Sequence, residues 1–504
     1  MKRVSENVLA FSGVETDNGL LLKSEDDHIT VEFDAKRDGY YTIELTYFHE
    51  ETEALLKGET TYPDGETLLF FEGLPHGSTR SLINIFFKKG KNTIFLRAPW
   101  EEVVISGMKN LGIKEDFEYE VSPKTFTYFC DSPKVIKSML KNYRKDILEV
   151  KTETGIKIPF MVSLKGNEET TASFVDVTLD AETVAGLGEG ERTLIYCLDG
   201  GIESRQSVVV RKTTPKTEFK IISLDVGCAN ATLLMLPNGK NMLVDSSTKT
   251  GARDVVIPYL EKHSIKLDYY LLTHFHGDHS GLKDEILEKY RIEKPEQEKV
   301  DALVKADKES RENYLKGFGY LDSTMLCFYD RIDKIWDLGG VKIEVLNSRY
   351  YEDGNPLKIY RHPFVKNNEY NYENTTSVSF ILDYNGFRYY HGADNYASAQ
   401  NRQIADFAKM GREDELRCHY FYGNHHFICD TSMDFVKTLN PYFVFVPSDI
   451  SLHCRSTYHY FYKRDVENYH FCNKRLLDTL IGGEVGNVRV CVNDAEDWYC
   501  ETNV

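Results

Sequence analysis

The segment HFHGDH crowds three histidines and one aspartate into six consecutive positions. His274 and His276 stand two residues apart at the end of an expected strand, so both imidazoles can turn to the same side of the loop. A glycine then lets the chain bend, which points Asp278 and His279 toward a second position. Neutral imidazole and carboxylate are preferred ligands of Zn²⁺ and also suit Mn²⁺ or Fe. Because a set of nitrogen and oxygen ligands leaves a position open for water, the motif predicts a catalytic metal site.

The elements around this motif predict a layered α/β region over residues 218–504. A buried strand, LDYYLLT, is expected directly before the histidines. Three further strands are expected in KIISLDVGCANATLLMLPNGKNMLVDSS, with a hairpin turn at PNGK. Between these strands, GARDVVIPYLEKHSI has the spacing of a helix. Residues 283–335 are charged with helical spacing, which predicts a helical insertion that is either a solvated face or a substrate cap.

Residues 1–117 are predicted to form an all-β domain. Tyr41, Ile43, Leu45 and Tyr47 alternate along one expected strand and so share one of its faces. The segment RSLINIFFKKGKNTIFLRAPW predicts two more strands joined by a turn. Together these segments resemble the jelly-roll domains of carbohydrate-binding modules, through strands of the forms GYYxIxLxY and KGxNxIxL. The resemblance implies a β-sandwich with a glycan or protein partner, or with a structural role alone.

Residues 118–213 are predicted to form a second, immunoglobulin-like β-sandwich. Its expected strands are IKIPFMVSL, TASFVDVTL, RTLIYCLDG and RQSVVVRK. Ahead of them, SPKVIKSMLKNYRKDI predicts a helix, with Ser132 as N-cap and Pro133 at the first helical position. No catalytic group of residues is found here, so a spacer or interface role is expected. A polar linker, RKTTPKTE, leads into the α/β region.

The composition excludes several classes of protein. At 504 residues the chain is too long for a single core, so several domains are expected. A net charge of −18, from 61 basic and 79 acidic residues, disfavours broad nucleic-acid binding. The sequence has neither the run of roughly 18 apolar residues that spans a membrane nor the apolar segment of a secretory signal, so a cytoplasmic location is expected. The ten cysteines are scattered without a CxxC pair, which favours reduced, structural thiols.

With its surroundings included, THFHGDHSGL resembles the signature of the metallo-β-lactamase superfamily. The resemblance covers about residues 218–500 and implies an αββα sandwich with a metal site at one edge of its two sheets. Three further segments match the family's pattern: VDSS, FRYYHGADN and FYGNHHF. They imply that Asp245 braces the histidine loop and that Asp394 bridges two metal ions. They also imply that His426 completes the second metal site, with His425 as the alternative.

Within the superfamily, SLDVGCANATLLMLPNGKNMLVDSS is similar to one branch in particular. That branch contains the C-terminal domain of the DNA-uptake competence protein ComEC and the bacterial phosphorylcholine esterases. It carries an asparagine segment where the lactamases have a third histidine, and Asn374 stands there in this chain. The first metal therefore has His274 and His276 as its strong protein ligands, completed by Asn374, water and substrate. Two departures from the branch are GCAN in place of GQGD and Phe427 in place of a glycine.

The resemblance implies a metal-dependent hydrolase in which one or two Zn²⁺ ions, or Mn²⁺ or Fe, activate water. Asp278, Asp245 and Asn374 are the expected catalytic residues. A phosphodiester or another phosphoester is the expected substrate. Two alternatives are a hydrolase of the lactonase or β-lactamase type and a non-catalytic binding protein whose metal site has lapsed.

Two tyrosine-rich segments supply candidates for substrate binding. Arg361 and His362 lie in the first segment, residues 348–374. Arg455 and His459 lie in the second, SLHCRSTYHYFYKRD. An arginine can hold an anionic oxygen through two hydrogen bonds, and a tyrosine face can stack against a base or a cation. These segments predict a small or locally bound anionic substrate.

Overall fold

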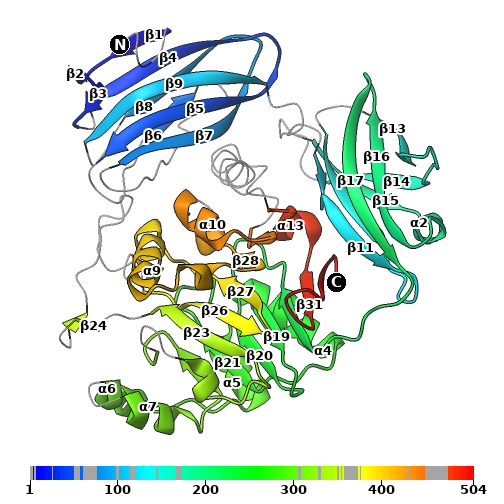
Figure 1. Ribbon diagram of the computed structural model, residues 1–504, viewed down its shortest axis with the longest axis vertical. Coiled ribbons are helices and arrows are strands. Elements are labelled where there is room, and N and C mark those ends of the chain that lie inside the picture. The colour runs from blue at the N-terminus through cyan, green and yellow to red at the C-terminus, as the bar shows by residue number, and fades with distance from the viewer. Residues whose placement is uncertain are drawn as a thin grey trace.

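The structure is a computed structural model. It describes residues 4, 7–24, 26–49, 57–60, 77–97, 102–113, 120–142, 146–165, 173–304, 308–326, 331–348, 351–352, 355–356, 373–374, 376–427, 431–448 and 475–504. Its sheets gather into three groups, with the N-terminal strands and the second set of strands on either side above a mixed α/β region (Figure 1). The chain is therefore multidomain and rich in β-structure.

The N-terminal group consists of a four-stranded and a five-stranded sheet, ordered β1-β4-β8-β6 and β2-β3-β9-β5-β7. The strands are β1 (Val8–Phe11), β2 (Val14–Thr16), β3 (Gly19–Leu22), β4 (His28–Ala35), β5 (Gly39–His49), β6 (Lys57–Thr60), β7 (Gly77–Phe87), β8 (Gly90–Arg97) and β9 (Val103–Ile113). On β5, the predicted inward face is confirmed, because Tyr41, Ile43, Leu45 and Tyr47 are all buried. Residues two apart on a strand point to the same side, so alternation alone placed them in the core.

The second group consists of two four-stranded sheets, ordered β10-β12-β15-β14 and β11-β17-β16-β13. They are built from β10 (Val121–Ser122), β11 (Thr125–Phe129), β12 (Ile136–Asn142), β13 (Ile147–Thr152), β14 (Phe160–Lys165), β15 (Ser173–Leu179), β16 (Gly190–Leu198) and β17 (Ile202–Arg211), with one short helix, α2 (Ala181–Gly186). The helix predicted in SPKVIKSMLKNYRKDI is wrong, since this segment contains β12. Ile136, Ser138 and Leu140 face the core with a period of two, and β12 pairs with the distant β15. Long-range pairing outweighed the local helical spacing.

The α/β region contains a seven-stranded sheet, ordered β22-β21-β20-β19-β18-β31-β32. Its strands are β18 (Phe219–Ser223), β19 (Thr232–Met235), β20 (Asn241–Val244), β21 (Tyr269–Leu272), β22 (Tyr320–Asp322), β31 (Val488–Val492) and β32 (Trp498–Thr502). The strands β20, β21 and β22 run parallel. Parallel neighbours need a crossover connection. The connection from β20 to β21 contains α4 (Ile257–Lys262), and that from β21 to β22 contains α5 (Lys283–Tyr290), α6 (Gln297–Val304) and α7 (Lys308–Leu315).

A six-stranded sheet, ordered β23-β26-β27-β28-β29-β30, packs against the first. It is formed by β23 (Lys342–Asn347), β26 (Ser379–Tyr384), β27 (Phe387–His391), β28 (Tyr420–Tyr422), β29 (Phe443–Val446) and β30 (Asp478–Ile481). One continuous apolar core fills the space between the two sheets. Helices α9 (Ala397–Met410) and α10 (Met433–Leu439) cover the outer face, where Phe407 and Phe435 join a second core with Tyr390 and Phe421. This layering agrees with the predicted αββα arrangement.

The second group of sheets is joined to the α/β region through a buried aspartate. Asp478, at the start of β30, accepts hydrogen bonds at Oδ2 from the backbone N–H groups of Lys124 (2.7 Å) and Thr125 (3.2 Å). Nearby, the rings of Phe129 and Tyr499 meet edge to face with centroids 4.9 Å apart. Burial raises the pKa of Asp478 to about 7. The joint therefore holds a carboxyl group whose charge changes near neutral pH.

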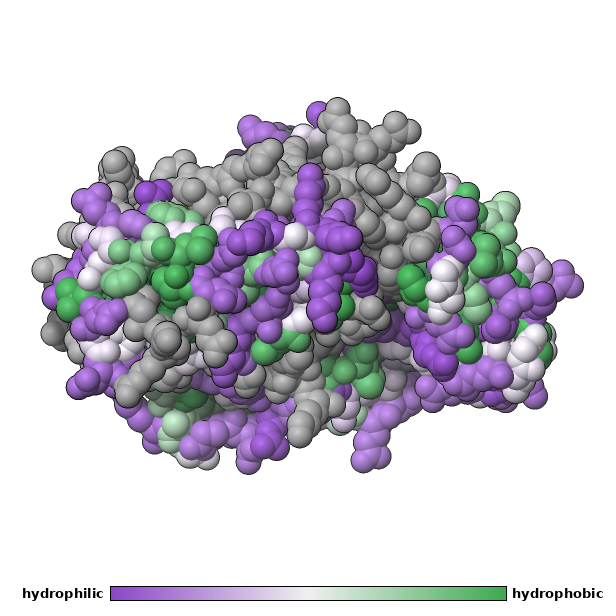
Figure 2. Space-filling view, turned by 90° about the horizontal axis from the view of Figure 1, so that it is seen from above, coloured by the Kyte–Doolittle hydropathy of each residue, from purple (hydrophilic) through white to green (hydrophobic). Residues whose placement is uncertain are grey.

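The surface seen from above is largely hydrophilic, with apolar residues in separate groups (Figure 2). This view is consistent with the high content of charged residues and the net charge of −18. Among the described residues, no helix combines the length and the hydropathy that crossing a bilayer requires.

Candidate metal centre

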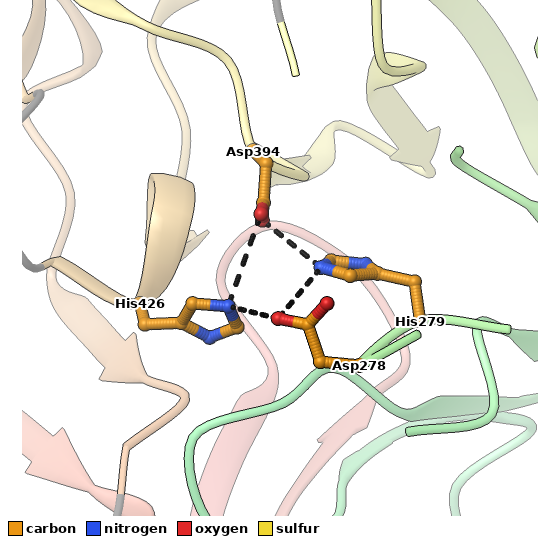
Figure 3. A group of neighbouring side chains, drawn as sticks. All are labelled: Asp278, His279, Asp394 and His426. Carbon is orange, nitrogen blue, oxygen red and sulfur yellow. Dashed lines mark hydrogen bonds and ion pairs between the residues drawn. The ribbon is translucent and has the colours of Figure 1, made fainter. Parts of the chain in front are cut away.

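Two groups of side chains at one edge of the α/β sandwich are arranged as potential metal ligands. Asp278, His279, Asp394 and His426 each place one ligand atom within 4.8 Å of all the others, and we call them the four-residue group (Figure 3). His274, His276 and Asp394 meet the same criterion and form the three-residue group. Asp394 belongs to both groups.

The ligands come from segments that follow four strands of the two sheets. His274 to His279 follow β21, and Asp245 follows the parallel neighbour β20. Asp394 follows β27, and His426 follows its parallel neighbour β28. The carboxyl ends of parallel strands lie at the same edge of a sheet, and ligands in α/β proteins commonly bind there. The packing of the two sheets therefore brings residues from 245 to 426 into one site.

The distances within the four-residue group are short. His426 Nε2 lies 3.0 Å from Asp278 Oδ2, and His279 Nε2 lies 3.1 Å from Asp394 Oδ1. The remaining approaches are His279 Nε2 to Asp278 Oδ2 and His426 Nε2 to Asp394 Oδ2, both 3.8 Å. In the three-residue group, His274 Nε2 lies 3.7 Å from Asp394 Oδ2. Asp394 Oδ2 is thus approached by one histidine of each group, and Oδ1 is approached by His279.

The donor atoms fit a divalent cation. His274 Nε2, His279 Nε2 and Asp394 Oδ1 are fully buried and make no hydrogen bond in the described structure. The distance between His279 Nε2 and Asp394 Oδ1 would allow a hydrogen bond, but the angles at the two atoms do not. This geometry is expected of two ligands that face a common third atom. Buried polar atoms rarely go unpaired, so this convergence marks a binding site. The nitrogen and oxygen set suits Zn²⁺, Mn²⁺ or Fe.

Asp245 orients one histidine directly. Its Oδ2 accepts a hydrogen bond from His279 Nδ1 at 2.8 Å, which leaves Nε2 of that ring for a metal. Its Oδ1 accepts the backbone N–H of Thr273 at 2.8 Å. Asp245 is completely buried and has a φ of 57°, a left-handed conformation that residues other than glycine adopt rarely. Such strain persists only where the surroundings hold the residue in place, and it is frequent at functional sites.

Thr273 links Asp245 to His274, a histidine of the three-residue group. Its hydroxyl donates to Asp245 Oδ2 at 2.7 Å and lies 3.2 Å from His274 Nδ1. Because the hydroxyl proton is engaged by the carboxylate, the threonine oxygen is left to accept from His274 Nδ1. Asp245 therefore sets the orientation of one histidine in each group. Sequence reasoning missed Thr273, although its place directly before the histidines was a usable signal.

His426 is oriented by the main chain. Its Nδ1 lies 3.0 Å from the carbonyl oxygen of Pro447, so Nε2 is directed at Asp278. No sequence signal connected Pro447 with this histidine, because the contact depends on how β29 lies beside β28. The preference for His426 over His425 in the second site agrees with this geometry.

The pKa of His279, in the four-residue group, is shifted in the opposite direction from those of the two histidines in the three-residue group. Burial lowers the pKa of His274 well below its usual value and also lowers that of His276, so both rings favour the neutral, metal-binding form. Burial would act likewise on His279, but the carboxylates of Asp394 and Asp245 raise its pKa well above the usual value. Burial by itself would raise the pKa of Asp394. The neighbouring His279 and His426 outweigh this effect and hold the pKa well below its usual range. An ion held by the four-residue group would therefore replace a proton on His279.

The loop from Gly423 to Phe427 explains one departure from the family pattern. His425, His426 and Phe427 have φ values of 42°, 52° and 59° in succession, a conformation that favours glycine. The Phe427 ring is buried in the outer core and packs closely on Gly423, where an added Cβ would lie 2.1 Å from it. Phenylalanine thus occupies the glycine position because the ring gains burial, and His426 still reaches Asp278.

Asn374 and His425 lie together beside the shared carboxylate. Asn374 Nδ2 donates to Tyr396 Oη at 2.9 Å and lies 3.3 Å from His425 Nε2. His425 Nε2 in turn lies 3.9 Å from Asp394 Oδ2. The preceding residue, Glu373, accepts the backbone N–H of Phe275 at 3.3 Å, which ties this segment to the histidine loop. Tyr396 was not found from the sequence.

The four candidate residues for substrate binding cannot be placed. Arg361, His362, Arg455 and His459 lie outside the described residues. In the GCAN segment, Asn230 supports the site through its backbone: its N–H donates to Asp278 O at 3.1 Å, and its carbonyl accepts from Ser247 N at 2.8 Å.

Comparison with protein families is consistent with this geometry. Residues 225–345 match the family described as Metallo-beta-lactamase superfamily, so the chain contains a domain of that superfamily. The matched stretch includes Asp245 and the histidine loop but ends before Asp394 and His426. The resemblance noted in the motif is confirmed for this part of the chain.

A curated relative covers a similar share of the chain. Recombination protein 2 of Haemophilus influenzae (strain ATCC 51907 / DSM 11121 / KW20 / Rd) is 32% identical over 125 residues, which is 24% of this chain and 15% of that protein. The match therefore spans a small part of the relative's length.

Solved structures of carbohydrate-binding modules resemble about a fifth of the chain. A CBM35 in complex with a glucuronic acid-containing disaccharide is 15% identical and covers 21% of this chain and 88% of its own, with a TM-score of 0.19. A CBM36 in complex with calcium and xylotriose is 10% identical and covers 20% and 92%, with a TM-score of 0.17. With scores this low, these likenesses support no conclusion about ligand binding.

Proposed function

We propose that this protein is a metal-dependent hydrolase that acts on a phosphodiester or another phosphoester. The observation that carries the proposal is the pair of ligand groups that share Asp394. A divalent cation at such a site supplies Lewis acidity and makes hydroxide available near neutral pH. Zn²⁺ is the proposed ion, in one or two copies, with Mn²⁺ or Fe as substitutes.

The chain's own residues have separate tasks in this proposal. Asp278, His279, Asp394 and His426 hold one ion, and His274 and His276 hold a second together with Asp394. Asp245 keeps the rings of His279 and His274 in the required tautomers, directly and through Thr273. Burial of His274, His279, Asp394 and His426 keeps bulk water from these side chains, which strengthens their electrostatic interactions.

The choice of a phosphoester rests on similarity. The short match to a relative named for recombination supports a phosphodiester, the bond that joins nucleotides. The similarity of the SLDVGCAN segment to the ComEC and phosphorylcholine esterase branch supports the same class. A net charge of −18 argues for a small or locally held anionic substrate over a long nucleic acid.

Metal analysis and hydrolysis assays test the proposal together. We expect at least one Zn²⁺ per purified chain by mass spectrometry and turnover of bis(4-nitrophenyl) phosphate that chelation abolishes and Zn²⁺ or Mn²⁺ restores. His276→Ala and Asp278→Ala should lose this activity. His263→Ala, an exposed histidine on the same domain, is the matched control and should retain it.

Two other results would redirect the assignment. Turnover of nitrocefin or a lactone without turnover of any phosphoester would favour the lactonase or β-lactamase type. An absence of both metal and turnover, with the variants indistinguishable from the wild type, would favour a binding protein with a lapsed site.

A further inference from the structure

Two adjacent histidines at the centre face different partners. His426 Nε2 points at Asp278 Oδ2, 3.0 Å away, inside the four-residue group. His425 Nε2 points instead toward Asn374 Nδ2, 3.3 Å away, and toward Asp394 Oδ2, 3.9 Å away. Among the described residues, His425 joins neither group of potential metal ligands. It nevertheless lies next to the carboxylate that the two groups share.

His425 is also the more accessible of the two. Its side chain is 20% exposed, whereas the side chain of His426 is 3% exposed and that of His279 is fully buried. A solute that reaches Asp394 from solvent can therefore meet the ring of His425, while His274, His279 and His426 lie beneath the surface.

The backbone holds His425 firmly in this place. Its N–H donates to the carbonyl oxygen of Ala393 at 2.9 Å, which fixes it to the loop that carries Asp394. Ala393, His425 and His426 all have positive φ values. Conformations of this kind are strained and are kept where they serve a site. Here both histidines reach Asp394 Oδ2, His425 at 3.9 Å and His426 at 3.8 Å.

Asn374 and Tyr396 hold the imidazole. Tyr396 meets the ring of His425 edge to face, with centroids 5.3 Å apart and an angle of 72°. The Asn374 amide contacts both the tyrosine hydroxyl and the imidazole, and Asn374 is only 4% exposed. Its Oδ1 is buried and makes no hydrogen bond in the described structure. Because the two ends of an amide have the same shape, either end can face the imidazole.

We propose that His425 contacts the substrate rather than a metal, and that Asn374 is its positioning residue. In the substrate-free protein, His425 Nε2 is held by the Asn374 amide. When a phosphoryl group binds beside Asp394, the Nε2–H of the His425 imidazole hydrogen-bonds to one of its anionic oxygens. The ligand class is thus a phosphate or phosphoester oxyanion. This inference rests on the proposed function, because it requires a phosphoryl group at the centre.

The local charges favour a hydrogen-bond donor at this place. Three carboxylates, Asp245, Asp278 and Asp394, lie within the centre, and Glu373 lies at its margin. An anionic substrate would be repelled by these groups unless cations and hydrogen-bond donors compensate them. A hydrogen bond from His425 to a charged oxygen corresponds to about 10- to 100-fold in affinity.

The test uses the full chain loaded with Zn²⁺ and measures three quantities for each variant. These are the metal content, the affinity for inorganic phosphate by calorimetry, and KM and kcat for bis(4-nitrophenyl) phosphate. We expect His425→Ala to keep the metal content of the wild type, to weaken phosphate binding about 10-fold or more, and to raise KM more than it lowers kcat. His425→Gln, which retains an N–H donor, should recover part of the loss. His426→Ala is the matched variant and should lose metal.

Asn374 is tested through its coupling to His425. Asn374→Leu removes the amide but keeps a similar volume, so we expect a smaller rise in KM at unchanged metal content. In the double variant with His425→Ala, the two effects should be less than additive, since Asn374 acts through the histidine. Full additivity would overturn the positioning role of Asn374.

Several outcomes would overturn the inference. Loss of a metal equivalent in His425→Ala would make His425 a ligand, and unchanged phosphate affinity and KM would remove it from the substrate site. Should the wild type bind phosphate without hydrolysing any phosphoester, the proposed function fails alone, and the phosphate affinities still decide the role of His425. A wild type that binds no phosphate contradicts both.

Discussion

The two ligand groups share Asp394 but differ in how they are built. The four-residue group takes its members from three separate segments, and its ligand atoms approach to 3.0 and 3.1 Å. The three-residue group has two histidines from one loop and shares Asp394, whose Oδ2 lies 3.7 Å from His274 Nε2. Four protein ligands complete a tetrahedron, whereas three leave one position open. We therefore expect the four-residue group to hold its ion more tightly.

The largest effect should come from the residue that the two groups share. Asp394→Ala removes a ligand from each group, so we expect both ions to be lost and turnover to fall by about 10³-fold or more, since bound cations supply several kcal/mol of stabilisation. Metal content and phosphoester turnover would be measured together. Asp254→Asn, an exposed aspartate paired with Arg253, is the matched control. Retention of one full equivalent of metal in Asp394→Ala would show that the groups do not depend on a shared carboxylate.

Each group should account for one of two steps in the binding of Zn²⁺. Asp278→Ala should abolish the tighter binding step in a Zn²⁺ titration, and His276→Ala should abolish the weaker one, because each residue belongs to one group only. Calorimetric titration of the chelator-treated protein separates the two steps. If His276→Ala removed the tighter step instead, the ranking of the groups would be reversed.

A smaller effect is expected from the residues that orient the ligands. Asp245→Asn disturbs His279 directly and His274 through Thr273, so we expect losses of about 10- to 100-fold in metal affinity or activity. Thr273→Val leaves the 2.8 Å contact between Asp245 and His279 intact and removes longer contacts to His274 (3.2 Å) and His279 (3.4 Å), so the three-residue group should weaken more than the four-residue group. The same titration checks both variants. Equal effects of Thr273→Val on both binding steps would contradict this division.

The smallest effect on the centre is expected from Asp478, at the joint with the second group of sheets. Asp478→Asn should leave metal content and turnover unchanged. Its pKa is raised to about 7 by burial, so between about pH 4 and pH 7 the folded chain holds a proton that the unfolded chain has lost. Stability attributable to this group therefore falls as pH rises through that window, by at most about 4 kcal/mol.

Urea unfolding of the wild type and of Asp478→Asn across this pH range measures the difference directly. The advantage of the wild type over the variant should shrink from pH 4 to pH 7 and then stay constant. A flat difference would show that the carboxyl group is not buried at the joint. With this contribution known, the pH dependence of the two ligand groups can be compared without interference.

Much of the centre could be predicted from the sequence, because one short motif carries four of its ligands. The period of two along β5 placed Tyr41 to Tyr47 correctly, since a strand imposes that alternation wherever one face is buried. The same reasoning failed for β12, where the apolar spacing also fits a helix and only pairing with β15 decided the outcome. An apolar pattern predicts secondary structure reliably where it fits either the period of a strand or that of a helix alone. It is ambiguous where it fits both periods.

The sequence by itself determined which chemistry the centre can support. The residue types and spacing of His274, His276, Asp278 and His279 predict a metal-binding turn after a strand, without reference to any other segment of the chain. The tertiary structure alone decided how these ligands are completed. It brought Asp394 and His426 from the other sheet, directed His425 toward Asn374, and placed the Pro447 carbonyl behind His426. These contacts depend on the packing of two sheets, and packing is set by the shape of a whole core rather than by any local pattern.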